Sequence, residues 1–137
     1  MTIYNLFISH SWAYSDAYEK FIALLDAKPR FSYNNYSVPK DDPIHTQGTD
    51  KELIEAIKRK IQPTQVVVIL SGVYASYSKW IDKEIQIAQT AFTTPTPILA
   101  VQPWGAERTS ETVKDAADKI VGWNTDSIVG GIRELVG

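Results

Sequence analysis

"QVVVIL", residues Gln65–Leu70, is the stretch of the sequence that decides the fold. Its run of aliphatic side chains leaves no polar face, and a strand with two apolar faces is typical of the centre of a parallel sheet that is covered on both sides. A half-buried strand would instead alternate apolar and polar residues. The run is also much shorter than the roughly 20 apolar residues of a membrane-spanning helix. We therefore expect a buried central strand, and no contact of the chain with a membrane.

Strand and helix patterns alternate on both sides of this central strand. The predicted strands are short apolar runs, and the predicted helices place apolar residues at three- and four-residue steps. Before the central strand we expect a strand over Ile3–Ile8, a helix over Ser15–Ala27, a strand over Phe31–Tyr36, a long loop over Ser37–Gly48 and a helix from a capping box at Thr49–Glu52 to Lys60. After it we expect a helix over Ser78–Ala91, a strand over Pro97–Val101, a short helix near Glu111–Asp118, an edge strand over Lys119–Val121 and a final helix capped by Asn124 or Thr125 and weakened by Gly130 and Gly131.

This alternation predicts an α/β fold, in which a parallel sheet lies between two layers of helices. For five strands wound in both directions the common strand order is 2-1-3-4-5, which is the flavodoxin-like three-layer sandwich. The length of 137 residues is typical of one domain, so we expect residues 1–137 to form a single unit. Hydrophobic residues make up 44% of the chain, which is enough for a packed core.

The composition excludes several kinds of site. The chain has no cysteine, which excludes disulfides and thiolate metal ligands. Its imidazoles are those of His10 and His45 alone, which argues against a catalytic zinc ion. The net charge of −2 and the absence of a basic block argue against nucleic acid as a partner. The N-terminus shows no basic start followed by an apolar run, so we expect a cytoplasmic protein.

The predicted strand order places a ligand crevice between the carboxyl ends of the first and third strands. "SHSW", Ser9–Trp12, follows the first strand, and "SGVYASYSKW", Ser71–Trp80, follows the third. Both segments are rich in hydroxyl groups and aromatic rings. Glu84 lies one helical turn after Trp80, along the edge of the apolar stripe of its helix, so we expect its carboxylate to face this crevice.

The usual ligands and reactions of this fold do not match these segments. There is no Gly-Lys-Ser/Thr phosphate loop, no G-x-G-x-x-G spacing and no glycine in the segment after the first strand. The acidic residues of a phosphate-accepting receiver domain are replaced by Ser9 and Ser71. No G-x-S-x-G motif supports a serine hydrolase. Asp82 projects from a different helical face than Glu84, so a paired-carboxylate glycosidase does not fit either.

A single carboxylate suffices when the leaving group departs without needing a proton. Nicotinamide leaves NAD⁺ in this way, because the cationic pyridinium becomes a neutral molecule. Positive charge then develops on the ribose, and a carboxylate such as that of Glu84 can stabilise it electrostatically. Trp80 would form a wall beside the sugar. NAD⁺ is consistent with these residues, although they do not single it out.

Three stretches of this chain together resemble a TIR domain. They are "LFISHSW" at Leu6–Trp12, the long loop after the second strand, and "SKWIDKEI" at Ser78–Ile85, which is similar to the Trp-x-x-x-Glu helix of that family. The resemblance covers essentially the whole chain. "NYSVPKDDPIH" at Asn35–His45 and "VGWNT" at Val121–Thr125 are further similar to the TIR proteins of the bacterial Thoeris antiphage system.

This resemblance implies an enzyme that cleaves NAD⁺ as its substrate, needs no further cofactor or metal, and makes a cyclic ADP-ribose isomer. That product would activate a separate NAD⁺-depleting effector with a sirtuin-type domain. Glu84 would be the catalytic carboxylate with Trp80 beside it, and the loop Ser37–Gly48 would mediate self-association. The substrate would also be lined by Ser9, His10, Ser11 and Trp12.

Two other functions remain open on the sequence. A non-catalytic adaptor would bind other TIR domains and would have no need of Glu84 in the crevice. An enzyme similar to nucleoside deoxyribosyltransferases would use a carboxylate on a nucleoside sugar and would form a covalent ester with it. Glu84 itself separates the adaptor from the leading hypothesis, and a trapped glycosyl adduct on Glu84 would favour the deoxyribosyltransferase-like enzyme.

Overall fold

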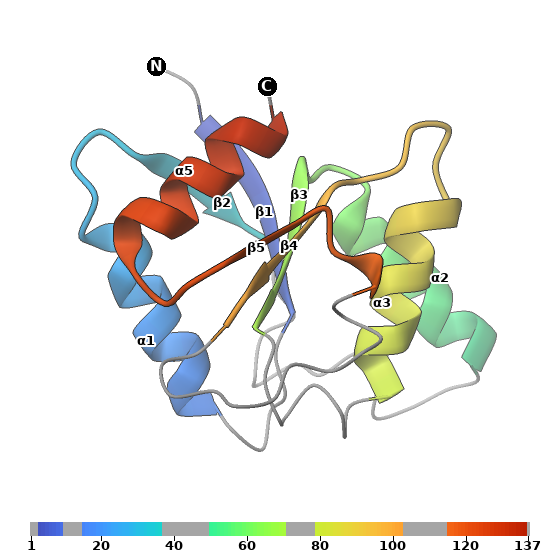
Figure 1. Ribbon diagram of the computed structural model, residues 1–137. Coiled ribbons are helices and arrows are strands. Elements are labelled where there is room, and N and C mark those ends of the chain that lie inside the picture. Colours follow the sequence, from blue (N-terminus) through green and yellow to red (C-terminus); the bar gives the residue numbers. More distant parts are fainter. Residues whose placement is uncertain (1–2, 10–14, 37–49, 71–78, 103–114, 137) are drawn as a thin grey trace.

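The computed structural model describes residues 3–9, 15–36, 50–70, 79–102 and 115–136. One sheet with the strand order β2-β1-β3-β4-β5 runs through the molecule, and all its neighbouring strands are parallel (Figure 1). The strands are β1 (Ile3–Ser9), β2 (Ser32–Asn35), β3 (Val66–Leu70), β4 (Ile98–Val101) and β5 (Lys119–Val121). The helices are α1 (Ser15–Asp26), α2 (Asp50–Ile61), α3 (Lys79–Thr90) and α5 (Thr125–Val136).

The helices form two layers, with α1 and α5 on one face of the sheet and α2 and α3 on the other (Figure 1). Side chains of a strand alternate between the two faces, so each strand feeds both layers of the core. In β3, for example, Val67 and Ile69 pack with α2 and α3, while Val66, Val68 and Leu70 pack with α1 and α5. All five residues of β3 are buried, which confirms the central strand that the sequence predicts.

The predicted strand order is confirmed, and each predicted element in the described ranges is found within one or two residues of its expected ends. The predicted second strand is shorter than expected, because regular pairing with β1 extends only over Ser32–Asn35. Residues 111–114 of the predicted short helix near residues 111–118 lie outside the described residues. Of the remaining four, Asp115 and Ala116 are helical, whereas Ala117 and Asp118 are not.

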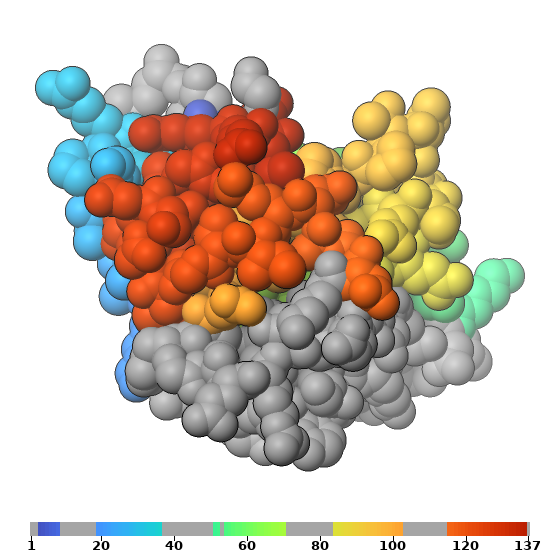
Figure 2. Space-filling view, viewed as in Figure 1, coloured from blue at the N-terminus to red at the C-terminus, as the bar shows by residue number. Residues whose placement is uncertain are grey.

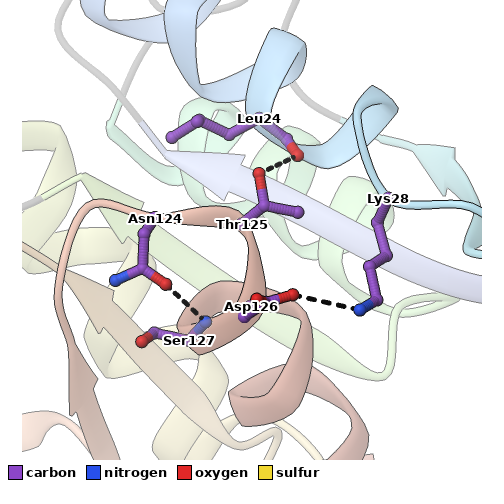
Figure 3. A network of polar contacts seen from close by, with 6 residues as sticks. All are labelled: Leu24, Lys28, Asn124, Thr125, Asp126 and Ser127. Carbon is purple, nitrogen blue, oxygen red and sulfur yellow. Dashed lines mark hydrogen bonds and ion pairs between the residues drawn. The ribbon is translucent and has the colours of Figure 1, made fainter.

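The start of α5 is fastened to the end of α1 (Figure 3). The Asn124 side-chain oxygen accepts a hydrogen bond of 2.8 Å from the Ser127 backbone N–H, so Asn124 caps α5. The Thr125 hydroxyl instead donates to the Leu24 carbonyl oxygen at 2.7 Å. The Lys28 ammonium lies 3.0 Å from the Asp126 carboxylate. These contacts join segments about a hundred residues apart in the sequence, and they connect the two helices of this layer to each other.

Asn5 holds three segments together at the amino-terminal edge of the sheet. Its amide nitrogen donates to the Pro63 carbonyl oxygen at 3.1 Å, and its amide oxygen accepts from the Asn34 side chain at 2.9 Å. Its backbone N–H donates to the Gln65 side-chain oxygen at 3.0 Å, and its carbonyl accepts from the Gln65 backbone at 2.8 Å. Asn5 thereby links β1 to β2 and to the turn between α2 and β3.

We expect Asn5→Asp to lower the free energy of unfolding at neutral pH by about 1–2 kcal/mol, because an acceptor then faces the Pro63 carbonyl in place of a donor. The folded-state pKa of the new carboxyl would be raised, so the loss should shrink as the pH falls and protonation restores a donor. Urea unfolding at pH 7 and pH 4 measures both effects. Asn34→Ala, which removes one of these bonds, is the control and should cost less; equal urea midpoints for Asn5→Asp and wild type would contradict the prediction.

The two adjacent glycines of α5 have different surroundings. Gly130 is exposed, and a Cβ built on it meets nothing within 4 Å. Gly131 is buried, and its Cβ would lie 3.0 Å from Leu99 Cδ1 and 3.2 Å from Val121 Cγ1. The sequence predicts that both glycines weaken the helix, but only Gly131 allows α5 to lie close to β4 and β5.

We therefore expect opposite effects from the same substitution at the two positions. Gly130→Ala should raise the free energy of unfolding by about 0.5–1 kcal/mol, because alanine favours a helix. Gly131→Ala should lower it by about 1 kcal/mol or more, because the buried Leu99 and Val121 side chains have to shift. Urea denaturation of the two variants measures the difference, and the same shift for both would show that the close approach of α5 is unimportant.

Within the described ranges, none of the helices has the length and apolar character that crossing a membrane requires.

Candidate functional site

The candidate site lies at the edge of the sheet where the parallel strands end. β1 and β3 are direct neighbours, and Ser9, the last residue of β1, is in register with Ile69. α1 leaves β1 toward one face of the sheet, and α3 follows β3 on the other face (Figure 1). The winding direction therefore changes between these two strands, which is where open α/β sheets bind ligands.

Glu84 is a buried carboxylate on α3, with 7% of the residue exposed. It lies in the first half of α3, which begins after β3 at the edge where the strands end. Its position is about 8 Å along the axis from the first residue of the helix. Glu84 therefore lies about one and a half helical turns from the end of α3 that is nearest to the end of β3.

The buried face of α3 is centred on Glu84. Among residues 84–90, whose side chains the structure describes, the other buried residues are Ile85, Ile87 and Ala88, and all three belong to the core that α2 and α3 share with the sheet. At about 100° per residue, Ile87 lies on one side of Glu84, and Ala88 and Ile85 lie on the other. The prediction that Glu84 occupies the edge of the apolar stripe was wrong, because the stripe also includes Ile87, which does not follow the expected three- and four-residue steps.

A carboxylate in this position is costly for folding. Removing an ionised group from water requires strong compensating interactions, and acidic residues are almost never fully buried unless they are paired. An apolar residue at position 84 would complete the apolar stripe that Ile85, Ile87 and Ala88 form. The burial of Glu84 is therefore the structural feature that most strongly indicates a functional carboxylate.

The other predicted site residues are placed only in part. Ser9 is placed by its backbone at the end of β1, and Trp80 lies in the first turn of α3, one turn before Glu84. The side chains of Ser9 and Trp80 are not among those that the structure describes. The segment containing His10, Ser11 and Trp12 and the loop Ser37–Gly48 lie outside the described residues. The structure thus places the backbone of Ser9 at the end of β1, Trp80 in the first turn of α3, and the buried Glu84 one turn further along that helix.

The described residues also form an open depression of about 480 Å³ between β5 and α5. Lys119, Asp126, Ser127 and Glu134 supply its charged and polar side chains. The Lys119 ammonium and the Glu134 carboxylate form an ion pair of 2.8 Å within it. α5 and β5 lie side by side on the surface, with α3 beyond them (Figure 2). Because α5 packs on the face opposite α3, this depression is separate from Glu84.

No group of three or more histidine, aspartate or glutamate side chains that could hold a metal ion occurs in the described part of the chain.

Comparison with models of known protein families assigns this chain to a family. The model of the family described as "Thoeris protein ThsB, TIR-like domain" matches residues 7–108, well over half of the chain. The matched range contains β3, α3 and Glu84. No curated protein matches the whole sequence closely enough to count as a relative. The chain belongs to the family of Thoeris ThsB TIR-like domains.

Proposed function

We propose that this TIR protein cleaves NAD⁺ as part of an antiphage defence system, with Glu84 as the catalytic carboxylate. The observation that carries the proposal is the burial of Glu84 on α3, the helix that follows the central strand β3. Membership of the Thoeris family supports a role in defence against phages. The proposed products are nicotinamide and a cyclic ADP-ribose isomer, which would act as a second messenger on a separate sirtuin-type effector.

The proposed step breaks the bond between C1 of the ribose and the pyridinium nitrogen. The bonding electron pair moves to the nitrogen, so nicotinamide leaves as a neutral molecule and the ribose becomes an oxocarbenium ion. The Glu84 carboxylate stabilises this positive charge from a site that largely excludes water, where electrostatic stabilisation is strongest. An internal hydroxyl or amine of the ADP-ribose then captures the cation and loses a proton, which closes the ring.

The remaining predicted residues would position the substrate. Trp80 precedes Glu84 by one turn of α3 and would cover the ribose and exclude water. Ser9 at the end of β1, followed by His10, Ser11 and Trp12, would bind the nucleotide on the other side of the crevice. Self-association through the loop Ser37–Gly48 would complete the active site. The resting protein, which has not self-associated, would therefore be inactive.

The decisive experiment follows nicotinamide release from NAD⁺ by chromatography, with and without lysate from phage-infected cells. A product lighter than ADP-ribose by one water molecule would identify cyclisation, and ADP-ribose itself would identify capture by water. Absence of release under both conditions would contradict the proposal and favour an adaptor. A covalent glycosyl ester trapped on Glu84 would favour chemistry of the nucleoside deoxyribosyltransferase type.

A further inference from the structure

Ala88 lies one helical turn after Glu84 on the same side of α3. Four residues separate the two positions by about 6 Å along the axis and by about 40° around it. Ala88 is 0% exposed and belongs to the core between α3 and the sheet. Ile85 and Ile87 lie on either side of this line. Glu84 and Ala88 therefore lie on one line along the buried side of α3.

The second half of α3 is tied to the sheet at Ala88. The Ala88 carbonyl oxygen accepts a hydrogen bond of 2.8 Å from the Thr96 backbone N–H. Thr96 is followed by Pro97, whose carbonyl oxygen accepts a bond of 2.9 Å from the Val67 backbone in β3. β4 begins at the next residue, Ile98. The end of α3 is thus connected to β3 and β4 by a short run of hydrogen-bonded backbone.

We propose that Ala88 is a positioning residue for Glu84, and this inference rests on the proposed function of Glu84. A small side chain at Ala88 lets α3 pack closely against the core that it shares with α2 and the sheet, and this packing sets how deeply the Glu84 carboxylate is held. A larger side chain cannot be accommodated by a shift of the C-terminal half of α3, because the Thr96 bond holds it. Instead, the N-terminal half should tilt away from the sheet and carry Glu84 with it.

Such a displacement should affect the chemical step more than binding. A misplacement of about 1 Å can reduce a reaction rate by about a hundredfold, because the transition state requires the charge at one place. Substrate binding depends mainly on contacts elsewhere in the crevice. The expected signature is therefore a fall in kcat at nearly constant KM.

The test compares Ala88→Ser, Ala88→Val and wild type in the nicotinamide-release assay, at a temperature where circular dichroism shows all of them folded. We expect Ala88→Val to lose about tenfold to a hundredfold in kcat, whereas Ala88→Ser should stay close to wild type. Val129→Ile is the matched control, because it adds a methyl group to a buried residue of α5 on the opposite face of the sheet. Its kcat should not change.

Crystal structures of wild type and Ala88→Val supply a measurement that does not depend on activity. The distance between the Cα atoms of Glu84 and Ile69 should increase by roughly 1 Å in the variant. An unchanged distance, or an unchanged kcat in a protein whose activity depends on Glu84, would overturn the role of Ala88 alone. If the wild-type protein releases no nicotinamide, or if its release does not depend on Glu84, the proposed function is overturned, and the inference with it.

Discussion

Replacement of Glu84 by glutamine should reduce nicotinamide release by about 10²–10³-fold or more, with kcat and kcat/KM falling together. Glutamine preserves the size and shape of the side chain but removes the negative charge. It can still bind the ribose hydroxyls of the ground state, so KM should change little. The charge matters only when the ribose becomes cationic, which is why the loss falls on the chemical step.

The interpretation of this result requires a folded protein and a comparable control. Glu84→Gln should melt within a few degrees of wild type, because the amide fills the same buried volume. Glu55→Gln removes an exposed carboxylate from α2 on the same face of the sheet, and it should leave the rate unchanged. Undiminished release by Glu84→Gln would end the assignment of Glu84 as the catalytic carboxylate.

The largest expected effect on stability comes from Ile69 in the central strand. Ile69 is 0% exposed and packs with α2 and α3, so Ile69→Ala should lower the free energy of unfolding by about 2–5 kcal/mol. The loss combines the transfer of the missing carbon atoms to water with the cavity that remains between the sheet and the helices. Whole domains are stable by about 5–15 kcal/mol, so this one substitution removes a large share.

Ile120 provides the control for this prediction within the same sheet. It lies in the edge strand β5 and is 41% exposed, so Ile120→Ala should cost less than about 1 kcal/mol. Urea denaturation followed by circular dichroism measures both variants. Equal midpoints for Ile69→Ala and Ile120→Ala would mean that burial in β3 does not control the stability of this fold.

Much of the fold follows from patterns within short segments. The apolar run at Val66–Leu70 predicts a buried parallel strand, and the alternation of helices and strands around it predicts the order 2-1-3-4-5 that the structure shows. That order in turn places the carboxyl end of β3 beside that of β1. The helix that follows β3 is α3, so its first turns are candidates for ligand contacts. Glu84 could thus be selected as a candidate before its surroundings were known.

The surroundings of Glu84 could not be predicted in the same way. Which arc of α3 is buried depends on how the helix packs beside α2 and against the sheet. This packing includes Ile87 and places Glu84 within the buried face rather than at its edge. The cap of α5 is a similar case, since Asn124 and Thr125 are both suitable residues. Only the position of α1 shows that the Thr125 hydroxyl binds the Leu24 carbonyl and leaves the cap to Asn124.

By itself, then, the sequence determined the elements, their order and one carboxylate in a place where a ligand could bind. The tertiary structure decided how deeply that carboxylate is buried, why Gly131 rather than Gly130 matters to α5, and how Thr96 joins the end of α3 to the segment before β4. The physical reason is that the two kinds of interaction act between residues at different separations along the sequence. Periodicity and capping arise between residues a few positions apart, whereas burial and close approach arise between segments that only the folded chain brings together.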